Sequence, residues 1–169
     1  KMGADNLTEF KVGDALNIPY PDNYFDAIWV SNVTSFIDKK EQALKEYFRV
    51  LKPFGYLGVA PIYYIKQPPK DLFVKVEELV GTKINVRDLE GWESLIKQSA
   101  SMAGVALEQC FCKDYIYEDQ QDNIDSWLDR ILKKDHLEEL NADVKAELKE
   151  RYTQCMKVFN ENLKYCGFS

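Results

Sequence analysis

The feature that most constrains this sequence is a strand, a helix and a second strand that follow one another through short connections. Residues 27–30, Ala-Ile-Trp-Val, form a continuous apolar run between polar turns, which is typical of a strand covered on both faces. Residues 41–51 carry apolar side chains at helical spacing ahead of Pro53, and residues 56–62 form another apolar run after Gly55. Such a unit builds a parallel sheet, so we predict an α/β fold.

The pattern predicts further elements on both sides of this unit. Strands are predicted at residues 10–12, 105–111 and 165–169, the last of them antiparallel and next to residues 105–111. Helices are predicted along the apolar stripes at residues 72–80, 89–103, 124–132 and 140–163. In the last of these we expect Leu140, Val144, Leu148, Cys155 and Phe159 to form one buried face. We interpret residues 1–169 as one domain, with a helical insertion at residues 115–162 on the substrate side.

Composition excludes several classes of protein. The net charge is −6, whereas phosphate binding needs clustered Lys and Arg, so we expect no nucleic-acid partner. No apolar run approaches the roughly 18 residues of a membrane span, and no charged-then-apolar leader is present, so we expect a cytoplasmic protein without a membrane partner. The sequence begins with Lys1 rather than Met, and we expect the true amino terminus to lie upstream.

The four cysteines could in principle serve a metal site. Cys110 and Cys112 flank one residue of a predicted strand and would point to the same face. However, there is no CxxC pair and His136 is the only histidine, so we expect no metal and interpret the cysteines as buried free thiols.

Polar or small residues follow three of the predicted strands. Ligands of open α/β sheets bind outside the carboxyl ends of the strands, where Asp14-Ala15, Ser31-Asn32 and Ala60 would lie. Asp14 could accept a hydrogen bond from an amine, and the Ala15 N–H could donate to a ring nitrogen. Asp14 could equally be a turn former, and Ser31-Asn32 could simply lead into the next helix.

The order of these pieces is more specific than any one of them. Gly-Asp-Ala at residues 13–15 is followed by a Leu-x-x-Pro-Tyr loop and by Phe-Asp-Ala-Ile at residues 25–28. The helix at residues 41–51 ends in Arg-Val-Leu-Lys-Pro, and "LEGWESLIKQSASMAGV" follows at residues 89–105. Together they resemble the class I S-adenosylmethionine-dependent methyltransferases of the branch that acts on small molecules. The likeness extends to about Cys112 and fades between Asp122 and Asn162.

The resemblance implies a Rossmann-like, mostly parallel sheet and S-adenosylmethionine as cofactor. It implies that Asp14 binds the adenine amino group, that Ala15 supplies a backbone contact to the ring, and that Ser31 and Asn32 border the methionine part and the methyl group. The implied reaction is in-line methyl transfer to a small-molecule acceptor, which needs alignment more than a general base.

Two departures from the family pattern have consequences. The chain has no Gly-x-Gly anywhere, and its first predicted strand matches the third strand of the family, so the first two strands and the floor of the cofactor site should be missing. Phe54 replaces the first Gly of the family's Pro-Gly-Gly, which affects the turn there. A non-catalytic remnant or interaction module therefore remains an alternative. A Rossmann-type oxidoreductase is disfavoured because it needs a Gly-rich pyrophosphate loop.

No catalytic residue can be assigned from the sequence. His136 lies in the charged segment "KKDHLEE" and is interpreted as a solvated helix residue. Tyr63 and Tyr64 could touch a substrate, although an aromatic core or rim is the simpler interpretation. The identity of the acceptor stays open, and so does a homodimer.

Overall fold

The computed structural model describes residues 7–84, 87–111, 115–116 and 139–168. The chain divides into two compact parts: residues 1–60 with 92–111 form the first part, and residues 61–91 with 112–169 form the second. Cys112, the predicted helix at residues 124–132 and His136 lie outside the described residues.

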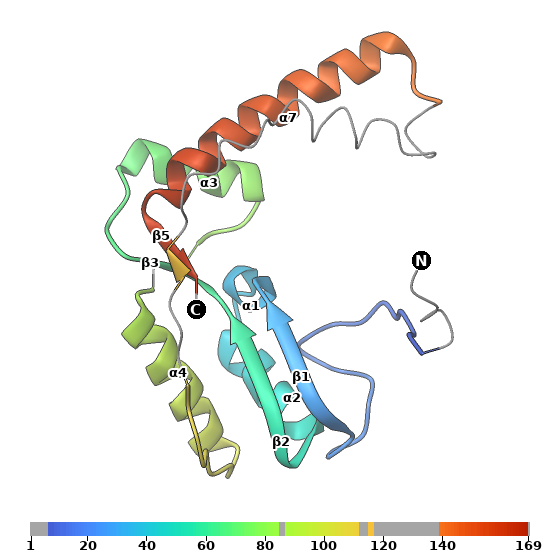
Figure 1. The fold of residues 1–169 in the computed structure, drawn as a ribbon, viewed down its shortest axis with the longest axis vertical. Helices are drawn as coiled ribbons and strands as arrows, with labels where there is room; N and C mark the ends of the chain where they lie inside the picture. Colours follow the sequence, from blue (N-terminus) through green and yellow to red (C-terminus); the bar gives the residue numbers. More distant parts are fainter. Residues whose placement is uncertain (1–6, 85–86, 112–114, 117–138, 169) are drawn as a thin grey trace. The chain divides into compact units, whose positions relative to one another are not determined.

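The first part contains the predicted strand–helix–strand unit. Strand β1 (Phe25–Ser31) is followed by the short helix α1 (Val33–Phe36), by α2 (Lys40–Val50) and by strand β2 (Leu51–Ala60). The two strands are parallel neighbours (Figure 1), which confirms the prediction of an α/β fold. Strand β2 starts directly after α2 and ends before Ile62, so it begins and ends earlier than the sequence suggested.

Helix α2 forms where its apolar spacing predicted it, and its apolar face is in the core. Leu44 and Ala43 have no exposed surface, and Tyr47, Phe48 and Val50 are also buried. Since burying one large apolar side chain contributes about 1.5–3 kcal/mol, this face alone accounts for the docking of α2.

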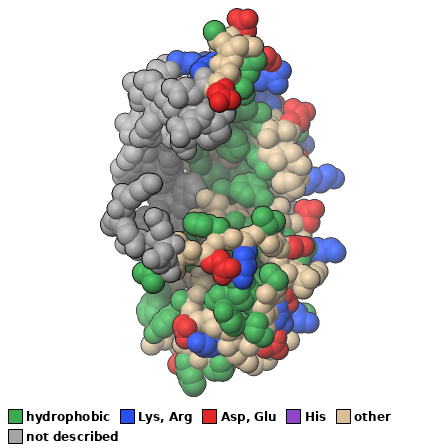
Figure 2. All heavy atoms as spheres, turned by 90° about the vertical axis from the view of Figure 1, so that its right-hand side faces the viewer, with side chains coloured by type: hydrophobic (Ala, Val, Ile, Leu, Met, Phe, Trp, Pro, Cys, Tyr) green, Lys and Arg blue, Asp and Glu red, His purple; other side chains and the backbone are tan. Residues whose placement is uncertain are grey.

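One face of the two-stranded sheet is open, which corrects the expectation that β1 is covered on both faces. Trp29 is 75% exposed and Tyr56 is 79% exposed, and these residues share a face because Ala27 pairs with Tyr56 and Trp29 with Gly58. The Trp29 ring lies over Gly58, where a Cβ would stand 2.3 Å from its Cε3 atom. Figure 2 shows hydrophobic side chains on the molecular surface.

Phe54 occupies a position inside β2 for which glycine is better suited. Its φ is 63°, in the left-handed region, and its side chain is 87% exposed. The residue lies where the pairing register shifts between Phe25 and Ala27. The concern raised by Phe54 in place of a family glycine was therefore justified, because a bulky residue adopts this conformation at a cost.

Two predicted strands of the first part are absent from the described structure. Residues 10–12 are not in a strand, and Phe10 and Val12 are fully exposed. Residues 105–111 are irregular, with Phe111 88% exposed. Both predictions were wrong because a strand also needs a hydrogen-bonding neighbour. Among the described residues, neither segment has such a neighbour.

Helix α4 (Leu89–Met102) confirms the helix predicted at residues 89–103. The Asp88 carboxylate accepts a hydrogen bond from the Gly91 N–H at 2.8 Å. Trp92 and Leu95 are buried as the apolar stripe predicted, whereas Met102 is 83% exposed.

The second part holds a small antiparallel sheet in the order β3 (Ile62–Tyr64), β5 (Cys166–Phe168), β4 (Tyr115–Ile116). The last strand is antiparallel, as predicted, but it pairs with β3 and β4 instead of residues 105–111. Helix α3 (Lys70–Val80), which ends at Val80 as predicted, packs against α7 (Ala142–Leu163) (Figure 1).

Helix α7 follows its predicted stripe but does not bury all of it. Val144 is 37% exposed and Leu148 is 40% exposed, while Cys155 and Phe159 are half-buried. The expectation of one buried face is therefore wrong for the first half of the helix. The two lengths give the reason: α7 has 22 residues and α3 has 11, so α3 can cover only about half of its partner.

Candidate functional site

The carboxyl ends of β1 and β2 lie side by side, as the sequence predicted for the ligand edge. Ser31 pairs with Ala60, and the Asn32 N–H donates to the Ala60 carbonyl at 2.8 Å. Asn32 then takes a left-handed conformation, with φ 60°, and stands at the N-cap position of α1 without a capping bond from its side chain. Asn32 thus leads into the next helix, as one interpretation held, and its amide is not used for capping. The Ser31 side chain is exposed at the same edge.

Asp14 lies in a tight turn and not at the end of a strand. Its Oδ1 atom accepts from the Leu16 N–H at 2.9 Å, and its carbonyl accepts from the Asn17 N–H at 3.0 Å. Asp14 is therefore a turn former, the alternative that the sequence left open. The carboxylate is exposed, and it has a second oxygen that can accept from a ligand. No described residue accepts a hydrogen bond from the Ala15 N–H.

The segment that follows this turn is fastened to α2 by Arg49. The guanidinium donates to the carbonyls of Ile18 and Tyr20, both at 2.9 Å, and to the Asp22 carboxylate at 2.8 Å. Its two other N–H groups donate to the Glu46 carboxylate at 2.8 and 2.7 Å.

Glu46 and Gln42, one and two helical turns before Arg49, continue the attachment. Glu46 accepts from the Ile18 N–H at 2.9 Å, and the Gln42 amide donates to the Leu16 carbonyl at 3.1 Å. The Glu46 hydrogen bond raises the pKa of Arg49, and the guanidinium in turn holds the pKa of Glu46 below its ordinary value in spite of partial burial. Both groups are therefore charged at neutral pH.

This set of polar side chains was not predicted from the sequence. A signal was present: Glu46 precedes Arg49 by three residues, a spacing that places the two side chains on one face of a helix. What no local pattern could show is that the partners of Arg49 are main-chain carbonyls of a distant loop.

Tyr63 and Tyr64 belong to the core of the second part. They are 4% and 6% exposed, and the Tyr64 hydroxyl donates to the Asn162 side chain at 3.3 Å. Asn162 in turn donates to the Cys166 sulfur at 3.4 Å. Burial raises the pKa of Tyr64 to about 12 and that of Cys166 to about 11, so both groups stay neutral. These side chains join β3, α7 and β5, in agreement with the simpler interpretation of the two tyrosines.

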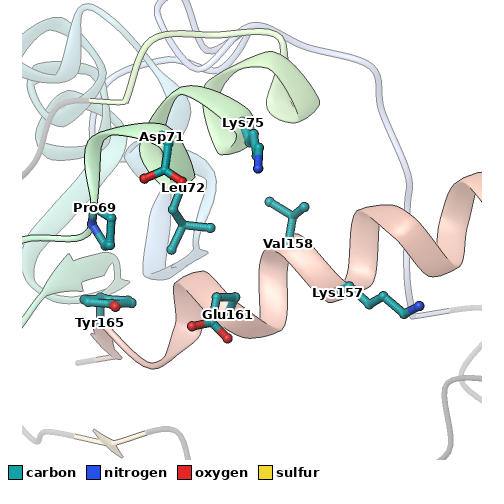
Figure 3. Close-up of a pocket in the computed structure, with 8 residues that line it drawn as sticks. All are labelled: Pro69, Asp71, Leu72, Lys75, Lys157, Val158, Glu161 and Tyr165. Carbon is teal, nitrogen blue, oxygen red and sulfur yellow. The ribbon is translucent and has the colours of Figure 1, made fainter.

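A pocket of about 430 Å³ opens between α3 and α7 in the second part (Figure 3). Its lining residues are Pro69, Asp71, Leu72, Lys75, Lys157, Val158, Glu161 and Tyr165. The volume suits a small molecule. The charged side chains of the lining are exposed and of both signs, and of the eight residues only Leu72 is buried, so the pocket by itself specifies no ligand class.

The described residues contain no cluster of three or more His, Cys, Asp or Glu side chains that could hold a metal ion. Three cysteines are described, all as free thiols: Cys110 is exposed, Cys155 half-buried and Cys166 buried. The expectation of buried thiols is thus correct for Cys166 and wrong for Cys110. In the part of the chain that the structure covers, no helix is long and apolar enough to cross a membrane.

Comparison with known proteins finds similarity in the part of the chain that contains this edge. A family profile described as a methyltransferase domain matches residues 1–59, which include Asp14, Ala15, Ser31 and Asn32. The methyltransferase GfsG of Streptomyces halstedii is 32% identical over 88 residues, which are 52% of this chain and 31% of that protein. The ubiquinone/menaquinone biosynthesis C-methyltransferase UbiE of Laribacter hongkongensis is 35% identical over 88 residues, 50% of this chain and 36% of that protein. The chain thus spans about a third of these curated relatives.

Solved structures agree on the fold. The crystal structure of MccD protein superposes with a TM-score of 0.69 at 23% identity, covering 98% of this chain and 67% of that chain. Phosphoethanolamine N-methyltransferase 2 of Haemonchus contortus, in complex with S-adenosyl-L-methionine, gives a TM-score of 0.59 at 14% identity, over 92% of this chain and 34% of that chain. The family profile, the relatives and the shared fold confirm the resemblance seen in the sequence: this chain is similar to the class I S-adenosylmethionine-dependent methyltransferases.

Proposed function

We propose that the intact protein carrying this chain transfers a methyl group from S-adenosylmethionine to a small-molecule acceptor. The observation that carries the proposal is that the profile match and the candidate site lie in the same residues. The residues matched by the methyltransferase profile contain the Asp14 turn, β1 with Ser31 and Asn32 at its carboxyl end, and all of β2 except Ala60. The relatives are longer than this chain, so we assign the activity to the intact protein.

The residues present fit the adenine and methionine parts of this cofactor. The Asp14 carboxylate can accept from the adenine amino group, and the Ala15 N–H can donate to a ring nitrogen. Ser31 is exposed and the Asn32 amide is not used for capping, so both side chains can hydrogen-bond to the methionine part.

When bound, S-adenosylmethionine would supply a methyl group on a positively charged sulfur. A bond from the acceptor lone pair to the methyl carbon would form as the carbon–sulfur bond breaks in line, which leaves S-adenosylhomocysteine, and a proton carried by the acceptor would pass to solvent. The task of this chain is then to bind and align. Alignment of reacting groups alone can contribute about 7–11 kcal/mol to lowering a barrier in favourable cases. The proposal therefore requires no general base among the residues described, and it names none.

For the acceptor, we propose that residues 115–162 supply the substrate side of a single methyltransferase domain. The second part supports this proposal, because it contains a pocket of small-molecule size lined in part by α7. A cytoplasmic location belongs to the same proposal and is supported by the free thiols of Cys110, Cys155 and Cys166. Cell fractionation would test it.

Calorimetry and a transfer assay test the function. The intact protein should bind S-adenosylmethionine and S-adenosylhomocysteine, whereas the 169-residue chain should bind them poorly because the Gly-rich loop is not in its sequence. Release of S-adenosylhomocysteine should then depend on one class within a panel of amine, hydroxyl and carbon acceptors. Failure of the intact protein to bind the cofactor would refute the proposal. Binding without transfer to any acceptor class would favour the non-catalytic alternative.

A further inference from the structure

Three side chains on one face of α2 hold the segment that connects the Asp14 turn to β1. They bond mainly to the backbone of that segment. Gln42, Glu46 and Arg49 are spaced four and three residues apart, so they line one stripe of the helix. Gln42 bonds to Leu16, Glu46 bonds to Ile18, and Arg49 bonds to Ile18 and Tyr20. Because Leu16 belongs to the Asp14 turn, the attachment starts within the turn itself.

We propose that Arg49, together with Glu46, is a positioning residue for cofactor binding, which holds the turn so that Asp14 and Ala15 meet the adenine ring in one fixed arrangement. The inference rests on the proposed function. Arg49 itself touches no part of the cofactor in this proposal, and it acts through the loop.

The hydrogen bonds of Arg49 suit this role. A guanidinium has five N–H donors, and here all of them are used: two on Glu46, one on Asp22 and one each on the carbonyls of Ile18 and Tyr20. Lysine has three donors on a flexible stem and cannot reproduce this planar arrangement. Glu46 holds the guanidinium in place from one turn earlier in α2, with its side chain only 16% exposed.

The loop also contacts its surroundings beyond these polar bonds. The rings of Tyr20, Tyr24 and Phe25 pack on one another with centroids 4.8 to 4.9 Å apart. The Asn23 and Tyr24 N–H groups donate to the carbonyls of Arg49 and Val50 at 3.0 and 2.8 Å. The far end of the loop is thus fixed without the Arg49 side chain, so removing that side chain should loosen mainly residues 14–20, the end that bears Asp14.

Preorganisation of the Asp14 turn should increase the affinity for the cofactor. If the turn is held before binding, the cofactor does not have to order it, and the affinity is higher than for a loose turn. Because the adenine lies far from the transferred methyl group in the cofactor molecule, loss of this positioning should raise the KM for S-adenosylmethionine and leave kcat nearly unchanged.

A double-mutant cycle in the intact protein separates positioning from general stability. The variants are Arg49→Gln, Arg49→Lys, Asp14→Ala and the double variant Asp14→Ala/Arg49→Gln. Lys52→Gln is the matched control, because it removes the partly exposed ion pair between Lys52 and Asp26 without touching the loop. Affinity for S-adenosylhomocysteine is measured by calorimetry well below the unfolding temperature, with circular dichroism of each variant.

We expect Arg49→Gln to weaken binding about tenfold, within the range for coupled neighbours, and Arg49→Lys to lose less. The double variant should bind at least about threefold more tightly than the product of the two single losses predicts, because both changes act on one contact. Lys52→Gln should bind like the wild type. If Arg49→Gln fails to fold, the cycle is run with Arg49→Lys.

Three results would overturn the inference. Arg49 variants that bind as tightly as the wild type would remove its basis, and so would losses that multiply without coupling to Asp14. An equal loss in Lys52→Gln would assign the effect to general destabilisation. If the wild type binds and Asp14→Ala binds equally well, the adenine contact of the proposed function fails as well, and this result is distinct from the first three.

Discussion

Replacing Asp14 by alanine tests the central contact of the proposed function. The structure gives the carboxylate one bond, from Oδ1 to the Leu16 N–H at 2.9 Å, on an exposed turn. The proposal adds a bond from the adenine amino group to the other oxygen. A charge-assisted hydrogen bond contributes about 1.5–3 kcal/mol, so affinity for S-adenosylmethionine in the intact protein should fall by about 10–150-fold.

Part of that loss would come from the turn, and an asparagine at this position allows it to be separated. In an Asp14→Asn variant the side-chain amide oxygen can keep the Leu16 bond, and it must then be shared with the adenine amine. The affinity of Asp14→Asn for the cofactor should therefore lie between those of the wild type and Asp14→Ala. Glu108→Ala, which removes an exposed carboxylate of the same part, is the control and should bind normally.

Calorimetric titration with S-adenosylmethionine reads out all four proteins. A des-amino analogue, in which hydrogen replaces the adenine amino group, adds a ligand-side check, because the difference in affinity between the wild type and Asp14→Ala should shrink to the part that comes from the turn. Unchanged affinity of Asp14→Ala for the natural cofactor would refute the reasoning and leave Asp14 as a turn former alone.

Three further predictions concern stability and reactivity. Phe54→Gly should stabilise the protein by roughly 0.5–1 kcal/mol in urea unfolding, since it relieves a left-handed conformation at an exposed site; a loss of stability would show that the ring packs against something. Iodoacetamide should label Cys110 in the folded protein and Cys166 only after unfolding, because burial keeps the Cys166 thiol protonated; peptide mass spectrometry distinguishes them. Glu46→Gln should destabilise the protein at neutral pH. Because Arg49 lowers the pKa of Glu46 in the folded state, that difference should shrink as the pH falls below about 4.5, and a constant difference would contradict the ion pair.

The helices were predictable because their signals are local. Apolar spacing and end signals placed α2, α3 and α4 within a few residues, for example at Gly81, where the chain takes a φ of 73°. Helix formation uses hydrogen bonds between residues four apart, so the sequence of the segment itself contains most of the information. What it did not contain was the extent of burial of α7, which depends on the length of α3.

Whether a predicted strand formed depended on whether it had a neighbour to pair with. Residues 27–30 and 56–60 pair as parallel strands, so both predictions were confirmed. Residues 10–12 and 105–111 have equally apolar patterns, yet no described neighbour pairs with them. An apolar run therefore indicates the capacity to form a strand, and the rest of the sheet decides whether the strand forms.

The candidate site shows the same division between local and distant information. Ser31 and Asn32 were placed at the ligand edge because the carboxyl end of a parallel strand follows from the strand itself. Arg49 was missed because the carbonyls to which it donates hydrogen bonds lie up to 31 residues away in sequence. A charged residue near the end of a helix is usually solvated, and only the structure distinguishes this one from the others.

For Asp14 the sequence posed two interpretations as alternatives, a turn former or a reader of the adenine base. The structure confirms the turn, and the turn is what makes the second role physically reasonable. A carboxylate has two oxygens, so the bond to Leu16 fixes the orientation of the group while one oxygen remains for a ligand. A carboxylate with no internal bond would have to be ordered by the cofactor, at a cost in affinity. A residue that stabilises its own turn is thus better prepared to bind, and the bond that suggests a structural role supports the functional one.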